Sequence, residues 1–434
     1  MVNLQHRVWI DVSKSTWKII LPPSISIGNQ QKILSLSFGY YNTGYKAEII
    51  NKNNYSNRSF IPVQLIQEKG SFKLGPSLGI MTTNGANGFR GNKKNFIDII
   101  NTGRKSGVFT FVFPIESLNL KSNTVTGYLY YPSTKKWVAK QLPLPDVIYN
   151  RIANRQEEEK TIVINHINSL KEIGVPLFNL KYFDKLSLNN WIKDSNELKG
   201  IIPETTALRP DTLEDFLGKY PIIYIKPVHG KAGIGFIRVD KKADNRYLIT
   251  YQTKGIAYVK EYNHQNQLWS TVNSFTAGKE YIIQQGIALR RFNGNPFDIR
   301  VLAQKNSVGV WGVTGIGIRV AGTGSITTHV PQGGNIQSFD IVFKQAFGPK
   351  KGEWKMRIKT LVIKIANQIE KQHNHPLGEL SMDLGLDEKN KLWFFEANSK
   401  PMKFDEPAIR KRSLLRLMQF TQYLFMKTSK EVIS

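Results

Sequence analysis

The stretch PIIYIKPVHGKAGIGFIRV, residues 221–239, joins an apolar run that ends at Lys226 to a glycine-rich loop and a second apolar run. The loop contains Gly230, Gly233 and Gly235, and glycines let backbone N–H groups approach a phosphate closely. It is not a P-loop, because the order G-x-x-x-x-G-K-[ST] is missing and a strand rather than a helix follows. The stretch therefore indicates a phosphate-binding turn between two strands, to be weighed with the rest of the chain.

Composition predicts a globular protein. The chain has 434 residues, which suggests two to four domains of about 150 residues each. Hydrophobic residues make up 41% and charged residues 21%, as in ordinary folded proteins. The sequence has no cysteine, which excludes disulfides, thiolate metal sites and a cysteine nucleophile. No apolar run reaches the roughly 18 residues of a membrane span, and the first residues lack a signal-peptide core, so we expect a soluble, cytoplasmic protein.

The chain is strongly basic. Sixty Lys and Arg residues against 33 Asp and Glu give a formal charge of +27, which favours anionic partners. The basic residues are scattered, and neither zinc-finger spacing nor the aromatic-basic signature of a common RNA module is present. We therefore expect no specific nucleic-acid binding.

The first half of the sequence predicts two small domains. Residues 1–70 read as a β-rich domain, because short strand-like runs are separated by turns rich in Asn, Gly and Ser; these runs are residues 32–38, 45–50 and 59–66. Residues 71–180 read as an α/β layer domain. Its continuous apolar runs are typical of buried parallel strands, and a helix is expected over residues 94–107 between them.

The second half predicts an antiparallel sheet, a long helix and a hairpin. The expected sheet strands are residues 279–289, 297–305, 308–321 and 325–330. Residues 357–372 place Ile358, Leu361, Val362, Ile365 and Ile369 on one helical face. The fold class is therefore α/β, of the α+β kind. The basic amphipathic stretch 409–430 predicts a C-terminal helix docked on the fold, with a membrane-surface or partner helix as the alternative.

The terminal hairpin, residues 378–399, concentrates oxygen ligands. Glu396 and Asn398 are two residues apart and share a strand face, and a short hairpin brings Asp383 alongside Glu396. Two carboxylates and an amide oxygen suit Mg²⁺, although two such carboxylates alone also fit ordinary surface charge. Together with the strand lysine and the glycine loop upstream, they favour phosphoryl transfer.

Eight segments in this order resemble the ATP-grasp superfamily, and the whole chain resembles the YheC/YheD-type ATP-grasp proteins, which are described as endospore coat-associated. The segments are FDKLSLNNWI (183–192), LKGIIPETTAL (198–208), IIYIKPVHGKAGIGFIRV (222–239), EYIIQQGIAL (280–289), PFDIRVLAQ (296–304), GIGIRVAG (315–322), THVPQGG (328–334) and LSMDLGLDEKNKLWFFEANSKP (380–401). The resemblance implies an ATP-grasp domain over residues 181–434, with a central lobe over about 181–282 and a C-terminal lobe over about 283–434.

The resemblance also implies roles for individual residues. Lys185 and Lys226 match lysines that reach the nucleotide phosphates, and the 230–235 segment matches a loop that closes over them. The nucleotide-binding residues it implies are Lys185, Lys226, Gly230, Lys231, Gly233, Gly235, Gln284, Gln285 and Ile287, with the adenine near Gln285 and Ile287. Where the superfamily often has an acid for the ribose, this chain has Gln284 and Gln285.

Further residues match catalytic and metal-binding positions. Arg300 and Arg319, with Lys226, match cations that hold phosphate or the acylated intermediate, and Asp298 is expected to orient a neighbour. The implied Mg²⁺ ligands are Asp383, Glu396 and Asn398. His329 replaces an Asn, so it either holds a polar contact or takes part in acid–base work. Lys400 is expected to point into the same site, whereas His373 and His375 are expected to cap a helix or lie on the surface.

The implied activity is that of an ADP-forming carboxylate–amine ligase, which uses ATP and Mg²⁺ to activate a carboxylate as an acylphosphate before an amine attacks. The expected substrates are a carboxylate and an amine acceptor, one of them peptide-like or acidic. Two alternatives stay open: an ATP-grasp kinase that phosphorylates a hydroxyl, and a non-catalytic assembly protein of the spore coat. If the resemblance to coat-associated proteins holds, we expect this cytoplasmic protein to be found in the mother cell or associated with the spore.

Overall fold

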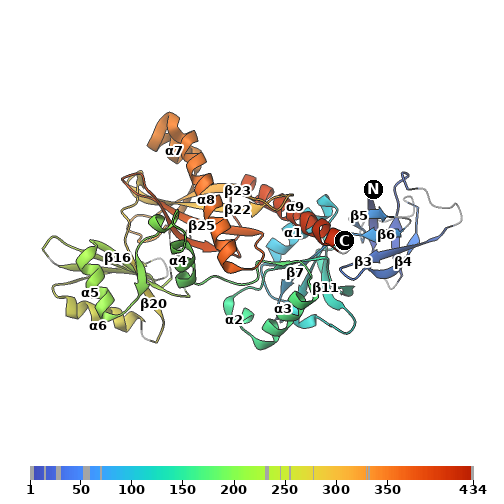
Figure 1. Cartoon of the computed structure of the whole chain (residues 1–434), viewed down its shortest axis with the longest axis horizontal. Helices are drawn as coiled ribbons and strands as arrows, with labels where there is room; N and C mark the ends of the chain where they lie inside the picture. The colour runs from blue at the N-terminus through green and yellow to red at the C-terminus, as the bar shows by residue number, and fades with distance from the viewer. Residues whose placement is uncertain are drawn as a thin grey trace.

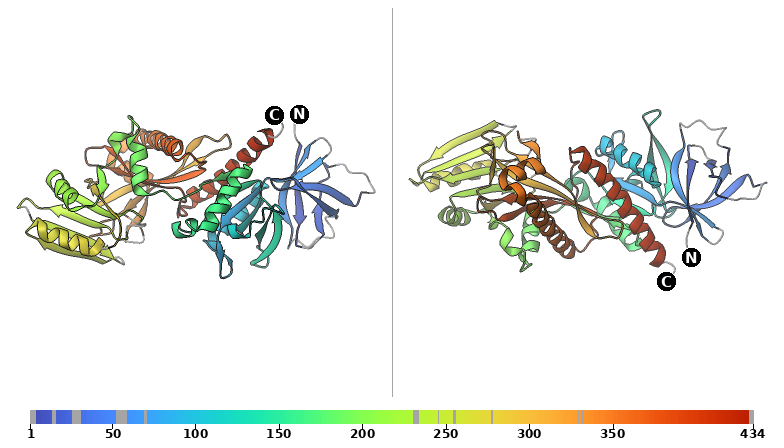
Figure 2. Two further views of the ribbon diagram at one scale, coloured as in Figure 1. Left: turned by 60° about the horizontal axis from the view of Figure 1, so that its bottom comes forward. Right: turned by 90° about the horizontal axis from the view of Figure 1, so that it is seen from above.

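The computed structural model describes residues 4–431 except 14–15, 26–30, 52–58, 69–70, 230–233, 245, 254–255, 277, 329 and 331–332. The described chain is elongated, with a small barrel at one end and a sheet flanked by helices α5 and α6 at the other (Figure 1), where α5 is Pro210–Lys219 and α6 is Gln265–Thr276. Two further views show the same order of parts along the long axis (Figure 2). The chain combines helices and strands, with a strand-only barrel at its start, which confirms the α+β class.

The first part is a closed barrel with strand order β1-β2-β4-β3-β6-β5. Closure pairs every strand on both sides and leaves no free sheet edge. Its strands are β1 Leu4–Asp11, β2 Trp17–Ile20, β3 Ile33–Phe38, β4 Thr43–Ile49, β5 Ile61–Glu68 and β6 Ser71–Leu74. Alternate residues of β3, namely Leu34, Leu36 and Phe38, are buried, as the two-residue strand period requires.

The second part is a six-stranded sheet of order β12-β11-β10-β7-β13-β14. Strand β7 is buried along its whole length and pairs in parallel with β10 and β13, which agrees with the continuous apolar runs. The strands are β7 Ser77–Thr82, β10 Phe109–Pro114, β11 Thr124–Tyr131, β12 Lys136–Pro143, β13 Val147–Asn150 and β14 Leu177–Phe178, with a small ribbon of β8 Asn84–Gly85 and β9 Gly88–Phe89. The helices are α1 Lys93–Ser106, α2 Arg155–Glu158 and α3 Thr161–Ile173.

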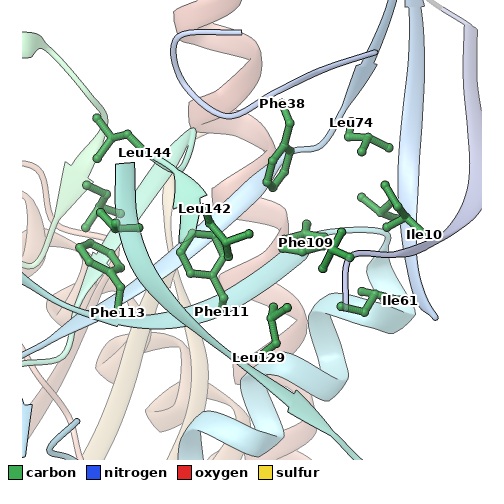
Figure 3. Packing of buried hydrophobic residues seen from close by; sticks show 14 of the residues in the cluster. Ile10, Phe38, Ile61, Leu74, Phe109, Phe111, Phe113, Leu129, Leu142 and Leu144 are labelled. Atoms are coloured by element: carbon green, nitrogen blue, oxygen red, sulfur yellow. The ribbon is translucent and has the colours of Figure 1, made fainter. Parts of the chain in front are cut away.

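One hydrophobic core joins the barrel to the second sheet (Figure 3). The rings of Phe38 in the barrel and Phe109 in the sheet meet edge to face with centroids 4.9 Å apart. Both side chains are buried. Because β6 completes the barrel, we propose that the first domain ends after Leu74 and that the second extends to about residue 180.

The third sheet has the order β15-β20-β16-β17-β18-β19. Its strands are β15 Thr205–Ala207, β16 Ile222–Pro227, β17 Ile237–Lys241, β18 Tyr247–Thr253, β19 Ile256–Tyr262 and β20 Tyr281–Gln285. Helices α5 and α6 pack on it, and helix α4, Lys185–Lys193, precedes it. Residues 221–239 thus contain β16 and β17, and the two strands pair antiparallel.

The fourth sheet has the order β24-β23-β22-β25-β26, with β21 paired to β22. Its strands are β21 Arg291–Phe292, β22 Asn295–Lys305, β23 Trp311–Val320, β24 Asn335–Ser338, β25 Glu379–Leu386 and β26 Leu392–Asn398. Helices α7 Phe339–Phe347, α8 Lys351–His373 and α9 Pro407–Glu431 accompany it. The expected face of α8 is confirmed, since Ile358, Val362, Ile365 and Ile369 are fully buried and Leu361 is half-buried against the same core.

Three sequence expectations are settled by this arrangement. Strand β20 pairs with β15 and β16 rather than joining the fourth sheet, because Ile282 and Ile283 continue the third sheet. The described part of residues 325–330 forms no strand. Helix α9 docks on the fold, as its Leu417, Met418 and Phe420 are buried against α1 and β14 residues. Among the described residues, no helix has the length and apolar composition needed to cross a membrane.

Candidate active site

A cavity of about 200 Å³ lies where the third and fourth sheets face each other. Strands β16, β17 and β20 line one side, and β22, β23, β25 and β26 line the other. The predicted site residues among its walls are Lys185, Lys226, Gln284, Gln285, Ile287, Arg319, Asp383 and Glu396. Residues that are far apart in the sequence therefore share one cavity.

Lys226, the second-last residue of β16, points its ammonium group into this cavity. Its Nζ donates a hydrogen bond to Gln284 Oε1 at 2.5 Å, and three aromatic rings, those of Tyr224, Phe236 and Phe395, lie within 6 Å of it. Burial lowers the pKa of Lys226 to about 8, although Glu396 opposes the shift. A buried cation held between an amide and aromatic rings is well placed for an anionic ligand.

Lys185 begins helix α4 after the N-cap Asp184, whose side chain accepts from the Ser187 N–H. Its ammonium group donates to Pro227 O at 3.1 Å and so meets the end of β16. Burial lowers the pKa of Lys185, and Glu396 partly offsets this. The structure thus brings both predicted phosphate-binding lysines to one wall of the cavity.

Residues 285–289 connect the third sheet to the fourth along the cavity wall. The Gln285 N–H donates to Glu204 O, and the Gly286 N–H donates to Ile222 O. Gly286 is needed here, since a Cβ atom would lie 2.4 Å from Ile222 Cγ2 and 2.6 Å from Ile222 O. The Ile287 backbone makes no hydrogen bond within the described residues, which leaves its N–H and C=O for a ligand in the cavity.

A buried ion triad connects three neighbouring strands of the fourth sheet. Arg319 on β23 places Nε 2.8 Å from Asp298 Oδ1 and Nη2 2.5 Å from Asp298 Oδ2, while Nη2 lies 2.7 Å from Asp383 Oδ2. Thr328 Oγ1 donates to Asp298 Oδ2 at 2.6 Å. The two carboxylates raise the pKa of Arg319 well above its ordinary value despite burial. Asp298 therefore orients Arg319, as expected from the sequence.

Asp383 and Glu396 lie opposite each other in the β25–β26 pair, and Asn398 follows on the same strand. Asn398 Nδ2 donates to Glu396 Oε1 at 3.2 Å. Asp383 is buried, Glu396 is half-buried and Asn398 is exposed, so this group runs from the cavity to the surface. Two adjacent carboxylates with an amide fit a hard cation such as Mg²⁺. No cluster of three or more His, Asp or Glu side chains suited to a metal occurs in the described residues.

Arg300 does not line the cavity. It pairs in register with Asp383 across β22 and β25, and its guanidinium lies 5.2 Å from the centre of the Phe404 ring. Gly235 adopts a positive φ of 76° next to the lining residue Phe236. Gly230, Lys231, Gly233 and His329 fall outside the described residues.

Two sequence expectations outside the cavity are wrong. Lys400 points away from the site, because its side chain pairs with Glu158 and lies 4.8 Å from the Tyr182 ring. His373 ends α8 but is buried rather than on the surface, with Phe183 and Trp191 packed edge-on against its imidazole. Burial lowers the pKa of His373 to about 4.

Sequence reasoning missed several cavity residues. Thr328 lines the cavity and donates a hydrogen bond to Asp298. Glu388, in the β25–β26 turn, lines the cavity near the 285–289 segment. Glu388 N–H also donates to Ala288 O at 3.3 Å. Tyr224 shares a face of β16 with Lys226, whereas Phe236 and Phe395 come from other segments, so only tertiary structure brings these two rings to Lys226. Glu388 lies in a short turn, where an acidic residue is usually exposed surface charge, so the sequence alone gives no reason to single it out.

Comparison with known proteins defines the class as ATP-grasp. A sequence model of the family described as YheC/D like ATP-grasp matches residues 174–424, more than half of the 434 residues. The chain therefore belongs to the YheC/D-like ATP-grasp family.

Two Bacillus subtilis (strain 168) proteins are similar over most of their length. Endospore coat-associated protein YheD is 26% identical over 376 residues, covering 83% of this chain and 82% of that protein. Endospore coat-associated protein YheC is 22% identical over 315 residues, which cover 71% of this chain and 85% of that protein. Among solved structures, D-alanyl-alanine synthetase A of Vibrio cholerae O1 aligns with a TM-score of 0.46 at 11% identity over 83% of this chain and 99% of that one.

Proposed function

We propose that this protein is an ATP-dependent, ADP-forming carboxylate–amine ligase. The observation that carries the proposal is the shared cavity, in which Lys185 and Lys226 of one wall face Arg319, Asp383 and Glu396 of the other. Phosphoryl transfer needs cations around the phosphates and carboxylates for a metal, and both are gathered here from separate sheets. Membership of an ATP-grasp family supports ATP as the nucleotide.

In this proposal the nucleotide lies along the wall formed by β16, β20 and residues 285–289. Lys185 and Lys226 bind phosphate oxygens as point charges. The adenine bonds to the backbone N–H and C=O of Ile287, between Ile222 and Phe394 of the cavity wall. Gln284 Oε1 accepts a hydrogen bond from Lys226 and Gln284 Nε2 donates one to Thr205, while the Gln285 side chain accepts one from the Glu204 N–H. We therefore assign the ribose contact to Glu388 rather than to either glutamine.

Asp383, Glu396 and Asn398 would hold Mg²⁺, which supplies charge neutralisation on the transferred phosphate when bound. Arg319 holds Asp383 in position through the contact of its Nη2 with Asp383 Oδ2. Although Arg300 lies outside the cavity walls, we assign it to hold the carboxylate that is to be activated, because it pairs in register with Asp383 on the next strand.

The proposed reaction has two steps. An oxygen of the substrate carboxylate attacks the γ-phosphorus, the bond to the β-phosphate oxygen breaks, and ADP leaves. An amine then attacks the acyl carbon of the acylphosphate, inorganic phosphate leaves with the C–O bond electrons, and the amine loses a proton. Lys226, Arg300 and Arg319 stabilise the negative charge on the oxygens, and no side chain is covalently modified.

The test uses a carboxylate labelled with ¹⁸O. The ligase mechanism transfers one labelled oxygen to the released phosphate, and mass spectrometry detects it. A kinase instead keeps the phosphate on its product and releases none. A non-catalytic coat protein releases neither ADP nor phosphate above the buffer rate, which would overturn the proposal.

The names of the two Bacillus subtilis relatives associate them with the endospore coat. We extend that association to this chain, and place its action in the mother cell or at the forming spore. A fluorescent fusion observed during sporulation tests the localisation, and uniform fluorescence in all cells would contradict it.

A further inference from the structure

The hairpin β25–β26 carries all three residues that we propose as metal ligands. Asp383 lies in the middle of β25, and Glu396 and Asn398 lie in the second half of β26. In the strand order of the described residues β26 is an edge strand, so the sheet holds it through β25 alone. Strand ends with few further contacts open readily. Whatever holds the chain after Asn398 therefore bears on the site.

Asn179, the residue after β14, bridges the two strands at the open end of this hairpin. Its Nδ2 donates to Glu379 O, at the start of β25, at 2.9 Å, and also to Ser399 O, directly after β26. Its Oδ1 accepts from the Gly378 N–H at 2.7 Å. One amide of the second domain is thus bonded to both strands of the hairpin.

The surroundings of Asn179 fix this amide in place. Asn179 is fully buried, has a φ of 59° and donates its N–H to Pro376 O at 3.0 Å. Asparagine adopts this left-handed conformation more readily than most residues. The ring of Phe178 stacks on Tyr149 with centroids 4.8 Å apart and packs against Gly378, where a Cβ atom would lie 2.7 Å from Phe178 Cδ2. A closely packed part of the second domain therefore presents the amide to the hairpin.

The chain that continues from Asn398 makes two more hydrogen bonds to the same side. Ser399 Oγ donates to Lys181 O at 2.6 Å, and Arg151 Nη2 donates to Pro401 O at 3.1 Å. Ser399 is fully buried. Both bonds hold the backbone after β26 against segments that follow β13 and β14.

Lys400 adds a buried ion pair to this attachment. Its ammonium group contacts Glu158 at the end of α2, and both side chains are almost fully buried. The Glu158 carboxylate also accepts from Asn150 Nδ2 at 3.0 Å and from the Tyr182 N–H at 3.1 Å. A buried ion pair whose carboxylate has further donors resists separation, because either partner left alone would be an uncompensated charge. The pair therefore fixes Lys400, two residues beyond Asn398, to the second domain.

We propose that Asn179 and the Glu158–Lys400 pair are positioning residues for the metal. The proposal rests on the ligase function and gives the second domain a part in it, because the domain holds the end of β26 in its place beside Asp383. Mg²⁺ demands nearly ideal octahedral geometry, so a small shift of one ligand oxygen weakens its binding. Loosening the attachment is therefore expected to weaken Mg²⁺ binding without touching a metal ligand.

The first test measures backbone hydrogen exchange by mass spectrometry in the full chain, without nucleotide or metal. Asn179→Gly permits the left-handed backbone and removes three side-chain hydrogen bonds. Amides of residues 392–401 are expected to exchange about tenfold faster, while those of β23 keep the wild-type rate. Asn374→Gly, at an exposed left-handed position after α8, controls for the backbone change. Unchanged exchange over residues 392–401 in folded Asn179→Gly overturns the proposal.

A second variant keeps the proposal testable if Asn179→Gly does not fold. Glu158→Gln with Lys400→Met removes both charges of the pair together, so that no uncompensated charge is buried. The matched control is Lys305→Met with Glu370→Gln. Glu370 likewise accepts from a lysine, a second side chain and a backbone N–H, but lies on α8. The same exchange experiment is applied to both double variants, and only the first should loosen residues 392–401.

Calorimetric titration with a non-hydrolysable ATP analogue, in EDTA and in increasing Mg²⁺, separates the metal from the nucleotide. Asn179→Gly and the Glu158–Lys400 double variant should bind the analogue in EDTA as the wild type does. They should need about tenfold more Mg²⁺ for half of its enhancement, and the controls should not. An unchanged Mg²⁺ requirement overturns the positioning role. If the wild type shows no Mg²⁺ enhancement, the metal assignment itself fails, and the positioning role fails with it, whatever the exchange rates show.

Discussion

Arg319 Nη2 lies 2.7 Å from Asp383 Oδ2, inside a sheet where both side chains are almost fully buried. The same guanidinium is held by Asp298 in a two-point contact, so one cation serves two carboxylates from neighbouring strands. This contact fixes the orientation of Asp383 at the edge of the cavity proposed to bind the nucleotide. It also makes the geometry of the site depend on a structural ion triad.

Replacing Arg319 by Met is expected to destabilise the protein by about 3–5 kcal/mol, because two buried carboxylates lose their counter-charge. Urea unfolding measures the change. The double variant Arg319→Met with Asp298→Asn is expected to recover part of the loss, since it removes one uncompensated charge. Arg246→Met, at an exposed ion pair, is the control and should change stability little. Equal effects of Arg319→Met and Arg246→Met would contradict the role of the triad.

Lys226→Met keeps a long side chain among the three aromatic rings but removes the charge. We expect ATP to bind about tenfold or more weakly, while Lys226→Arg retains an intermediate affinity. Fluorescence titration with a labelled ATP analogue gives the dissociation constants. Lys242→Met, an exposed lysine in the β17–β18 turn, serves as the matched control. Unchanged affinity in Lys226→Met would remove this lysine from the phosphate site.

Gly286→Ala places a methyl group 2.4 Å from Ile222 Cγ2 and so forces residues 285–289 away from β16. We expect both a lower melting temperature and a higher KM for ATP, because the segment that we propose to receive the adenine moves. Gly352→Ala on α8 has open space around its Cβ and should be neutral or slightly stabilising. If Gly286→Ala matches Gly352→Ala in both measurements, the segment does not position the nucleotide.

His373 gives a pH dependence of stability with a defined sign. Burial lowers its pKa from 6.5 to about 4, so the folded state prefers the neutral imidazole. Above pH 6.5 the imidazole is neutral in both states, so it does not lower the free energy of unfolding. As the pH drops from 6.5 toward 4, the unfolded state takes up a proton that the folded state does not, and the free energy of unfolding falls by at most about 1.4 kcal/mol per pH unit. His373→Phe keeps the ring packing and should flatten the urea stability curve in this window. A stability curve of His373→Phe that runs parallel to the wild-type curve between pH 6.5 and 4 would contradict this assignment.

Local patterns predict much of the fourth sheet and its helices. The spacing of Ile358, Val362, Ile365 and Ile369 is enough to identify the buried face of α8, since a helical period needs only neighbouring residues. The hairpin likewise predicts the pairing of Asp383 with Glu396, because a short turn fixes the register.

Long-range pairing cannot be read from local patterns. Whether β20 joins the third or the fourth sheet depends on packing of Ile282 and Ile283 against distant strands, and the apolar run is compatible with either. The contact of Arg319 with Asp298 and the burial of Lys400 against Glu158 likewise join separate elements. The roles of the predicted site residues stay proposals, and the predictions above test them.

The most direct test of the nucleotide site is calorimetric titration with a non-hydrolysable ATP analogue, in Mg²⁺ and in EDTA. The wild-type protein should bind more tightly with Mg²⁺. The variant Asp383→Asn with Glu396→Gln should lose that enhancement and bind about tenfold or more weakly, while remaining folded by circular dichroism. Equal affinity of the folded double variant in Mg²⁺, or no binding by the wild type, would contradict the assignment of this cavity to Mg·ATP.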